Sequence, residues 1–298
     1  MRYLLVNADD YGIGPATSEA ILDLAMRGRV TSAVLMVNSP YAVQSVSAWQ
    51  KAGKPMELGW HPCLTMDAPI LPPGKVPSLV GADGCLWPLP QFMRRWFLGR
   101  LQAAEIAAEL QAQHDHFVEL VGHAPTVVNS HQHTQIFRPV GDILIDILKK
   151  QRPLPYLRRI RESFAMLVKI PGARLKRSFL SFLGRRDARL QEGAGLPGND
   201  RLAGITDPPY SADPEFFTRW LGKIKGAVIE LACHPGHYDA TLIGRDCTGN
   251  DGLLERRVHE YRLLCQSSYR EAYTRAGFTL VSPAQFILHG RRGLAHAA

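Results

Sequence analysis

The stretch that decides the fold is Val6-Asn7-Ala8-Asp9-Asp10-Tyr11-Gly12, close to the start of a chain of 298 residues. Residues 3–8 are mostly apolar and stop abruptly at the acid pair and its glycine turn signals, which predicts a buried strand followed by a loop. In α/β proteins the carboxyl ends of parallel strands face the ligand crevice. Two carboxylates at this point are therefore placed for chemistry.

The acid pair itself has two interpretations. Adjacent carboxylates repel each other and lose hydration on burial unless a cation or a network of donors holds them, and a metal ion is the simplest such partner. The alternative is that Asp9 or Asp10 caps a helix predicted over residues 15–27, with the pair exposed in a turn. Both interpretations stay open on this motif alone.

Length and composition favour one large folded domain over residues 1–298. The length suits a (β/α) barrel, which needs about 250 residues plus insertions, and 46% hydrophobic against 21% charged residues is typical of a globular protein. The five cysteines are odd in number and widely spaced, which indicates a reducing compartment. With no charged leader and no apolar run near ~18 residues, we expect a cytoplasmic protein.

Strand-like and helix-like segments alternate along the chain. Strands are predicted over residues 31–37, 56–64, 126–130, 202–206, 226–232 and 279–281, and helices over residues 41–51, 101–121, 139–149 and 255–276. Residues 67–90, dense in proline and glycine, are expected to form a functional loop. This alternation predicts an α/β fold, a parallel sheet or barrel with helices outside.

The positive charge is concentrated in one segment. Residues 158–189 contain ten basic and two acidic residues, which accounts for the whole net charge of +8, and apolar residues interleave with them. A basic amphipathic insertion over about residues 156–190 suits contact with an anionic membrane, here the inner face of the cytoplasmic membrane. The alternatives are ordinary barrel helices with solvated Arg and Lys, or an oligomer contact. Nucleic acid is disfavoured, because the aromatics are all Phe and no recognition motif accompanies them.

Ionisable residues recur at four predicted strand ends. A single histidine at such a place is more often structural than functional, but residues at successive strand ends converge if the strands form a parallel barrel. One carboxylate and two imidazoles make a facial triad that suits a divalent ion, which would allow hydrolysis at neutral pH. The residues concerned are Asp9, Asp10, His61, His131, His133 and His234.

Four motifs carry a family resemblance. They are Asn7-Ala8-Asp9-Asp10-Tyr11-Gly12, Gly59-Trp60-His61, Asn129-Ser130-His131-Gln132-His133 and Cys233-His234-Pro235-Gly236. In this order they resemble the YdjC-like carbohydrate deacetylases, relatives of chito-oligosaccharide deacetylase, and among them the hopanoid-associated HpnK branch. The resemblance implies a distorted, TIM-barrel-like (β/α) barrel, a divalent metal, and removal of an acetyl group from an N-acetylated sugar. For this branch it implies an N-acetylglucosaminyl hopanoid as substrate.

The resemblance also implies roles for individual residues. Asp10, His61 and His131 match the metal positions, and Asp9 matches the proposed general base. We expect zinc or magnesium, although such a ligand set also accepts manganese, cobalt or nickel. His234 is our candidate proton donor, because a near-neutral pKa would suit that role; alternatively it orients Asp9 or a ligand.

Three further residues are candidates for substrate or supporting contacts. Asn7 lies in the first motif, and His133 would share a face with His131 if the strand stayed extended there. Gln135 stands where some relatives carry another histidine. Glutamine binds metals poorly, so a site with more than three protein ligands is not expected.

Two other function classes compete with deacetylation. A metal-dependent phosphoesterase or glycoside hydrolase on a related barrel would release phosphate or free sugar, whereas a deacetylase releases acetate and leaves a new amine. A non-catalytic lipid-binding protein would bind vesicles regardless of Asp9.

Overall fold

The first strand, β1 (Arg2–Tyr11), lies in the middle of a parallel eight-stranded sheet in the computed structural model, which describes residues 2–288. The strand order is β5-β4-β3-β2-β1-β7-β6, and β8 pairs with the start of β1. The other strands are β2 (Ser32–Leu35), β3 (Glu57–Trp60), β4 (Val127–Val128), β5 (Tyr156–Leu157), β6 (Arg201–Ala203), β7 (Val228–Cys233) and β8 (Phe278–Leu280).

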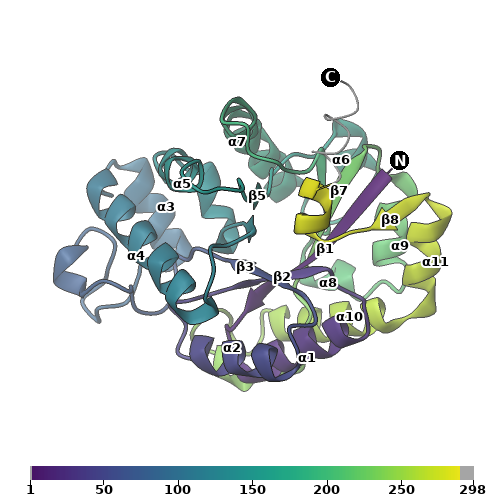
Figure 1. Ribbon diagram of the computed structural model, residues 1–298, viewed down its shortest axis with the longest axis horizontal. Helices are drawn as coiled ribbons and strands as arrows, with labels where there is room; N and C mark the ends of the chain where they lie inside the picture. Colours follow the sequence, from purple (N-terminus) through teal and green to yellow (C-terminus); the bar gives the residue numbers. More distant parts are fainter. Residues whose placement is uncertain (1, 289–298) are drawn as a thin grey trace.

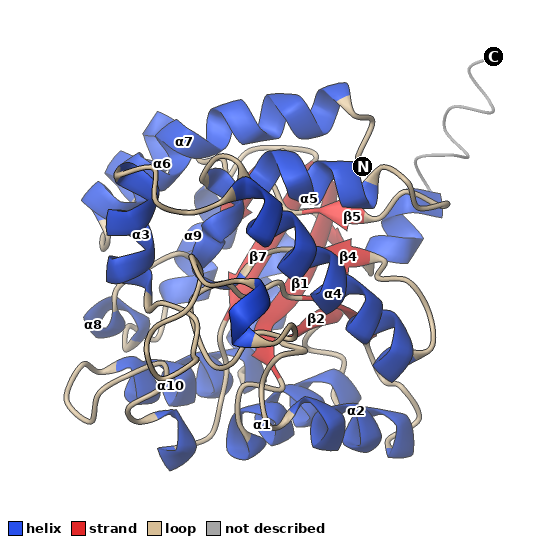
Figure 2. Ribbon diagram, turned by 90° about the vertical axis from the view of Figure 1, so that its left-hand side faces the viewer, coloured by secondary structure: helices blue, strands red, loops and turns tan. Residues whose placement is uncertain are grey.

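Helices surround the curled sheet, as Figures 1 and 2 show. They are α1 (Pro15–Met26), α2 (Ala42–Lys51), α3 (Leu89–Phe97), α4 (Ala103–Val121), α5 (Val140–Leu148), α6 (Phe164–Lys169), α7 (Arg174–Gly193), α8 (Pro208–Ser211), α9 (Phe216–Lys223), α10 (Leu253–Cys265) and α11 (Ser267–Arg275), with short 3-10 helices η1 (Pro73–Lys75), η2 (His131–Ile136) and η3 (Ala240–Leu242). The predicted α/β barrel-like fold is confirmed.

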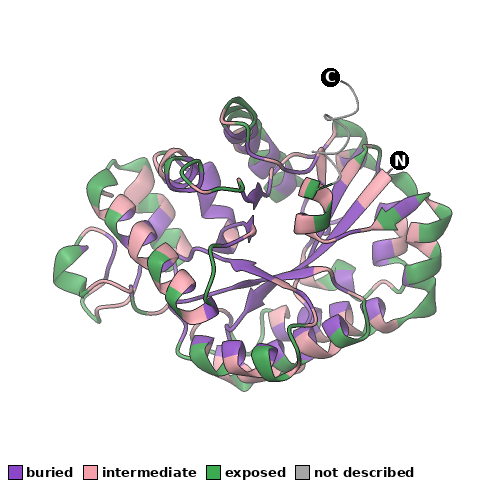
Figure 3. Ribbon diagram, viewed as in Figure 1, coloured by how far each residue is buried: buried purple, intermediate pink, exposed green. Residues whose placement is uncertain are grey.

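The strands are buried and the helices are buried on one side, as Figure 3 shows. In α4, Ile106, Leu110 and Phe117 recur at helical spacing and are all fully buried, as their pattern predicted. The helix ends at Gly122, whose φ of 89° is a left-handed conformation that glycine adopts without strain. Within residues 2–288, no helix has the length and hydropathy to cross a membrane.

Two predicted segments differ from the structure. The single helix expected over residues 255–276 is two helices, α10 and α11, because the backbone at Gln266 is extended, with ψ of 150°. The loop expected over residues 67–90 overlaps the first two residues of α3. Its start is held by the buried Glu109, which accepts hydrogen bonds from the backbone N–H groups of Ile70 and Leu71.

The basic segment is built into the barrel. It comprises β5, α6 and α7, and two of its ten basic side chains, Arg158 and Arg177, are fully buried. Arg177 pairs with Glu162, and Arg158 reaches the centre of the barrel. Membrane contact through this segment could therefore involve only part of its basic residues. The exposed members are Lys169, Arg174, Lys176, Arg185, Arg186 and Arg189.

Candidate active site

A bulge in β1 turns both acids of the first motif toward one cavity. Ala8 pairs with Ala33 and Tyr11 with Leu35, so β1 holds one residue more than β2 over this interval. Consecutive side chains of a regular strand point to opposite faces, and an extra residue breaks that alternation. Asp10 also has a φ of 65°, a conformation that non-glycine residues adopt mainly at constrained sites. Asp9 and Asp10 consequently both line the cavity.

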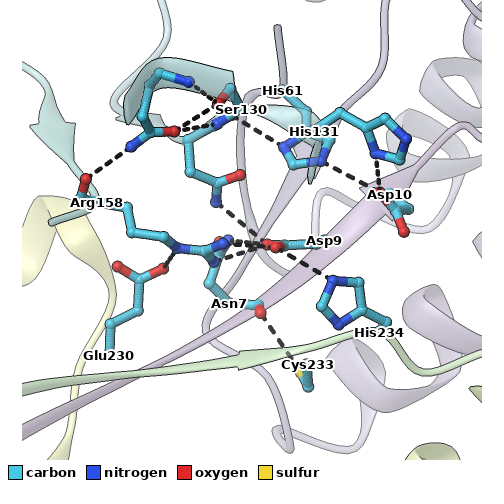
Figure 4. A network of polar contacts seen from close by, with 12 residues as sticks. Asn7, Asp9, Asp10, His61, Ser130, His131, Arg158, Glu230, Cys233 and His234 are labelled. Atoms are coloured by element: carbon cyan, nitrogen blue, oxygen red, sulfur yellow. Dashed lines mark hydrogen bonds and ion pairs between the residues drawn. The ribbon is translucent and has the colours of Figure 1, made fainter. Parts of the chain in front are cut away.

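Three of the predicted residues converge as a candidate metal centre. Asp10 Oδ1 lies 3.2 Å from His61 Nε2 and 3.0 Å from His131 Nδ1. One ligand atom from each residue falls within 4.8 Å of the others, and all three side chains are buried. They come from the bulge of β1, the end of β3 and the segment after β4, so the predicted meeting of strand ends occurs (Figure 4).

The hydrogen bonds around His61 fit a cation. His61 Nδ1 lies 3.0 Å from the backbone oxygen of Asn129, which can only accept, so Nδ1 carries the hydrogen. The lone pair of Nε2 then faces Asp10 Oδ1 across 3.2 Å. Two buried acceptors at that distance repel each other unless a cation or a proton lies between them. A nitrogen and oxygen donor set of this kind suits a divalent ion such as zinc.

Asp9 is held by a different partner. Arg158 donates to both its oxygens, from Nη1 to Oδ2 at 2.6 Å and from Nη2 to Oδ1 at 2.8 Å, while Arg158 Nε binds Glu230 at 2.6 Å (Figure 4). Burial would raise the pKa of Asp9, but the Arg158 guanidinium holds that pKa well below its usual range. Asn7 and Asn129 also donate to Oδ1, at 2.9 and 3.2 Å. Asp9 is thus an oriented carboxylate beside the candidate metal centre.

His234 follows β7 and faces Asp9. Its Nε2 lies 3.7 Å from Asp9 Oδ2, and its Nδ1 is 3.0 Å from Nη2 of Arg256. Burial, followed by the positive charge of Arg256, lowers the pKa of His234 to about 4. The expectation of a near-neutral pKa for His234 is therefore wrong. The sequence shows neither the burial of this ring nor the Arg256 cation next to it.

The three remaining candidates have different positions. His133 is buried and lines the cavity, although Gln132 and His133 have φ of 52° and 59°, so the chain is not an extended strand there. Gln135 accepts from Ser130 and donates to the backbone oxygen of Arg158, so it makes a supporting contact.

Asn7 also makes a supporting contact. Besides binding Asp9, it accepts a hydrogen bond from the Ser32 hydroxyl at 2.7 Å, and it is buried. Neither Asn7 nor Gln135 is among the residues that line the cavity. Of the two roles considered for Asn7 and Gln135, substrate contact and support of other site residues, their contacts fit the second.

A second arginine holds Asp10. Arg257 Nη2 lies 2.7 Å from Asp10 Oδ2 and 2.9 Å from Asp246 Oδ2, and Asp246 Oδ1 lies 3.5 Å from His131 Nε2. Arg257 therefore holds the carboxylate of Asp10, and Asp246 lies beside Nε2 of His131. Sequence reasoning missed five site residues, namely Arg158, Glu230, Asp246, Arg256 and Arg257. Of the five, only Glu230 lies in a strand that the sequence predicts, and none of them directly follows one.

The site opens into a cavity of about 660 Å³. Its lining combines the ionisable groups described above and Lys176 with apolar residues that come largely from α3 and α7. These apolar residues, called the apolar wall below, are Leu89, Met93, Phe137, Leu175, Phe179, Leu180, Ile205 and Leu253. A ligand that fills this cavity must combine a polar group with an apolar portion.

Comparisons relate the chain to known proteins. Residues 3–275 match the family described as YdjC-like protein. A chitooligosaccharide deacetylase of Klebsiella pneumoniae (strain 342) is 33% identical over 94% of this chain and 97% of its own. A carbohydrate deacetylase of Homo sapiens is 26% identical over 93% and 88%. A crystal structure from Enterococcus faecalis V583, of a protein described as a proposed cellobiose-phosphate cleavage protein, matches with a TM-score of 0.78 at 23% identity over 96% and 98%. This last match supports the fold.

Proposed function

The chain belongs to the YdjC-like family, and from that premise we propose that it is a metal-dependent N-deacetylase that hydrolyses the acetamide of an N-acetylglucosamine-type sugar. The observation that carries the proposal is the buried Asp10, His61 and His131 cluster with the Asp9 carboxylate beside it. The relatives named as deacetylases support the same reaction.

The geometry gives each acid a separate task. Asp10, His61 and His131 would hold the divalent ion, which when bound polarises the amide carbonyl and lowers the pKa of water. Asp9 is kept ionised by Arg158 and takes the proton from the attacking water as the new C–O bond forms. As the C–N bond breaks, the sugar nitrogen takes a proton from His234 in its protonated form and leaves as an amine, and the proton that Asp9 took from the water then passes to His234, whose Nε2 lies 3.7 Å from Asp9 Oδ2.

The apolar wall of the cavity supports a lipid-linked sugar as substrate. A free sugar presents hydroxyl groups around its ring and offers much less apolar surface to residues such as Met93, Phe137 and Leu180 than a hydrophobic aglycone does. A sugar attached to a hydrophobic aglycone would place its acetamide at the ionisable groups and its aglycone against the apolar wall. We propose an N-acetylglucosaminyl hopanoid, which is the substrate that the motif resemblance implies.

The outer face of α6 and α7 supports contact with a membrane. Phe164, Leu175 and Phe182 are 75%, 89% and 72% exposed, and the six exposed basic residues lie on the same two helices or between them. Large exposed apolar groups mixed with cations suit the interface of an anionic bilayer. Since Leu175 also lines the cavity, docking at the inner face of the cytoplasmic membrane would bring the cavity next to the lipid.

The test is a product analysis with three substrates. The zinc-loaded protein is incubated with an N-acetylglucosaminyl hopanoid, an octyl N-acetylglucosaminide and a chito-oligosaccharide, and acetate and new primary amine are measured. We expect both products from all three substrates, with a lower KM for the two lipid-like ones, and none with Asp9→Asn. Release of phosphate or free sugar would favour the rival hydrolases. Vesicle binding without any turnover would favour a lipid-binding protein.

A further inference from the structure

We propose that the exposed end of α3 enters an anionic lipid bilayer together with α7, so that the mouth of the cavity between these two helices opens directly into the membrane. The inference rests on the proposed function, because it makes the membrane the place from which a lipid-linked sugar reaches the site. It extends the membrane contact to a helix that lies outside the basic segment.

The most exposed large apolar side chains of residues 2–288 lie on three helices. Phe97, at the end of α3, is 83% exposed, second only to Leu175 of α7, and Phe164 of α6 and Phe182 of α7 follow. Figure 2 shows α3 and α6 on the same, left-hand side of the molecule, and α6 packs against α7. Single exposed apolar residues are ordinary, but the largest of them gathered around one cavity indicate a contact surface.

α3 continues the apolar lining of the cavity out to the surface. Leu89 and Met93 line the cavity, and Phe97 follows at the same spacing of four residues, which places all three along one side of the helix. Phe97 is not among the lining residues, and the next residue, Leu98, is exposed as well. This row of apolar side chains therefore begins inside the cavity and ends outside it.

A second row on α7 has the same form. Leu175 and Phe179 line the cavity, and Phe182 follows three residues later on the same side of the helix without lining it. Two apolar rows, on helices far apart in the sequence, thus lead from the cavity to the outer surface. The hydrophobic part of a ligand that entered or left the cavity would stay in contact with apolar groups along either row.

The end of α3 is fixed to the wall of the cavity, so its exposed residues are presented by a packed helix. Trp96 donates from its indole N–H to the backbone oxygen of Arg138, and its ring packs against Phe137 with the ring centroids 4.9 Å apart. Phe92, one turn earlier, is fully buried, and Phe137 lines the cavity. Phe97 therefore keeps a defined position beside the cavity mouth.

The charge of α3 indicates what covers this surface. Residues 89–101 contain Arg94, Arg95 and Arg100 and no acidic residue, and Arg94 and Arg100 are exposed. Arginines next to exposed aromatic and aliphatic groups suit the boundary between anionic headgroups and acyl chains. A folded protein that covered both rows would have to match the opening between them in shape, whereas lipid adapts to it. The occupant is therefore an anionic bilayer.

The test measures sedimentation of the full zinc-loaded chain with vesicles of equal parts phosphatidylcholine and phosphatidylglycerol. Phe97→Ser combined with Leu98→Ser should weaken binding about tenfold or more, because two apolar side chains no longer leave water. The matched control Val43→Ser changes a residue that is 63% exposed on α2, away from α3 in Figure 2, and should bind like wild type. In Phe97→Trp, lipids brominated in their acyl chains should quench more tryptophan fluorescence than in wild type.

Turnover separates uptake from the membrane from the chemistry at the metal centre. An N-acetylglucosaminyl lipid embedded in the same vesicles should be deacetylated about tenfold more slowly by the Phe97→Ser and Leu98→Ser double variant, in proportion to its lost binding. Octyl N-acetylglucosaminide in solution should be turned over at the wild-type rate, because neither residue lines the cavity.

Wild-type vesicle binding by the double variant, or no added quenching in Phe97→Trp, would overturn the proposal. A dimer in sedimentation velocity that the double variant dissociates would overturn it as well, because the surface would then belong to a second copy of the chain. If wild type binds vesicles through α3 but turns over no N-acetyl sugar, the proposed function fails and the membrane surface stands.

Discussion

Arg158 binds both oxygens of Asp9 and one oxygen of Glu230, so one fully buried guanidinium pairs with two buried carboxylates. Buried ion pairs gain little over an apolar replacement of both partners, but removing one partner leaves an uncompensated charge. The Arg158 guanidinium is therefore both a structural centre of the barrel and the group that orients the proposed base.

Arg158→Met is expected to lower the free energy of unfolding by about 3 to 5 kcal/mol, because two carboxylates lose their partner. It should also abolish turnover. Urea unfolding measures the first effect. The control is Arg219→Met, in the partly exposed pair with Asp213, for which a change below about 1 kcal/mol is expected. If both variants lost less than about 1 kcal/mol of unfolding free energy, Arg158 would not be the partner on which Asp9 and Glu230 depend.

His61→Ala and His131→Ala should each reduce bound zinc to a small fraction of the wild-type content and remove activity. Each change takes away one of three protein ligands. Elemental analysis after gel filtration gives the metal content. His116→Ala, a partly exposed histidine of α4 paired with Glu119, is the matched control and should bind the wild-type amount. Full metal content in either ligand variant would remove that residue from the set.

Phe179→Ala tests the apolar wall. Its ring lines the cavity on α7, and its loss should raise KM for an octyl N-acetylglucosaminide about tenfold, the usual effect of one lost apolar contact. KM for a chito-oligosaccharide should change much less. Phe97→Ala, on α3 but not among the residues that line the cavity, should affect neither substrate. An equal rise for both substrates would argue against an apolar aglycone at this wall.

Arg174→Glu combined with Arg185→Glu should weaken binding to vesicles that contain anionic lipid. Each basic residue near such a surface contributes about 1 kcal/mol, so at low salt the loss should exceed tenfold. Both side chains are exposed on α7, unlike the buried Arg177. Lys51→Glu is the control, because α2 lies on the opposite side of the barrel from α7 (Figure 1). No loss in vesicle sedimentation would discard the docking proposal.

The convergence of Asp10, His61 and His131 could be predicted because it depends on topology. Parallel strands carry their carboxyl ends to one edge, and strand ends are marked in the sequence by a change from apolar residues to turn residues. The path of the chain at His133 could not be predicted, because it depends on local conformation. His133 lines the cavity as a candidate should, but it reaches it through a left-handed turn that no alternation pattern indicates.

The arginine that pairs with Asp9 and Glu230 could not be predicted, because the composition of a segment does not indicate which of its charged side chains are buried. Arg158 is 149 residues from Asp9 and 72 from Glu230, and it stands among nine other basic residues of similar appearance. The break between α10 and α11 could not be predicted either, because the helical pattern of residues 255–276 continues through Gln266.

Asp187 on α7 provides a test of stability against pH. It is buried, and Gln191 donates to it at 2.6 Å; burial raises the pKa of Asp187 to about 7 against that hydrogen bond. The folded state therefore keeps a proton that the unfolded state loses above about pH 4. The contribution of Asp187 to the free energy of unfolding should fall as pH rises from about 4 to 7 and stay constant above that range.

Asp187→Asn removes this ionisation, so the variant should gain on the wild type as pH rises, by at most about 4 kcal/mol at pH 8. Near pH 4 the two proteins should differ little, because the wild-type carboxyl is then protonated and neutral like the amide. Urea unfolding at pH 4.5, 6 and 8 measures the difference. Asp146→Asn, at an exposed carboxyl of α5 paired with Lys149, is the control and should show no such pH dependence. A constant difference between Asp187→Asn and wild type across the three pH values would mean that Asp187 ionises normally in the folded protein.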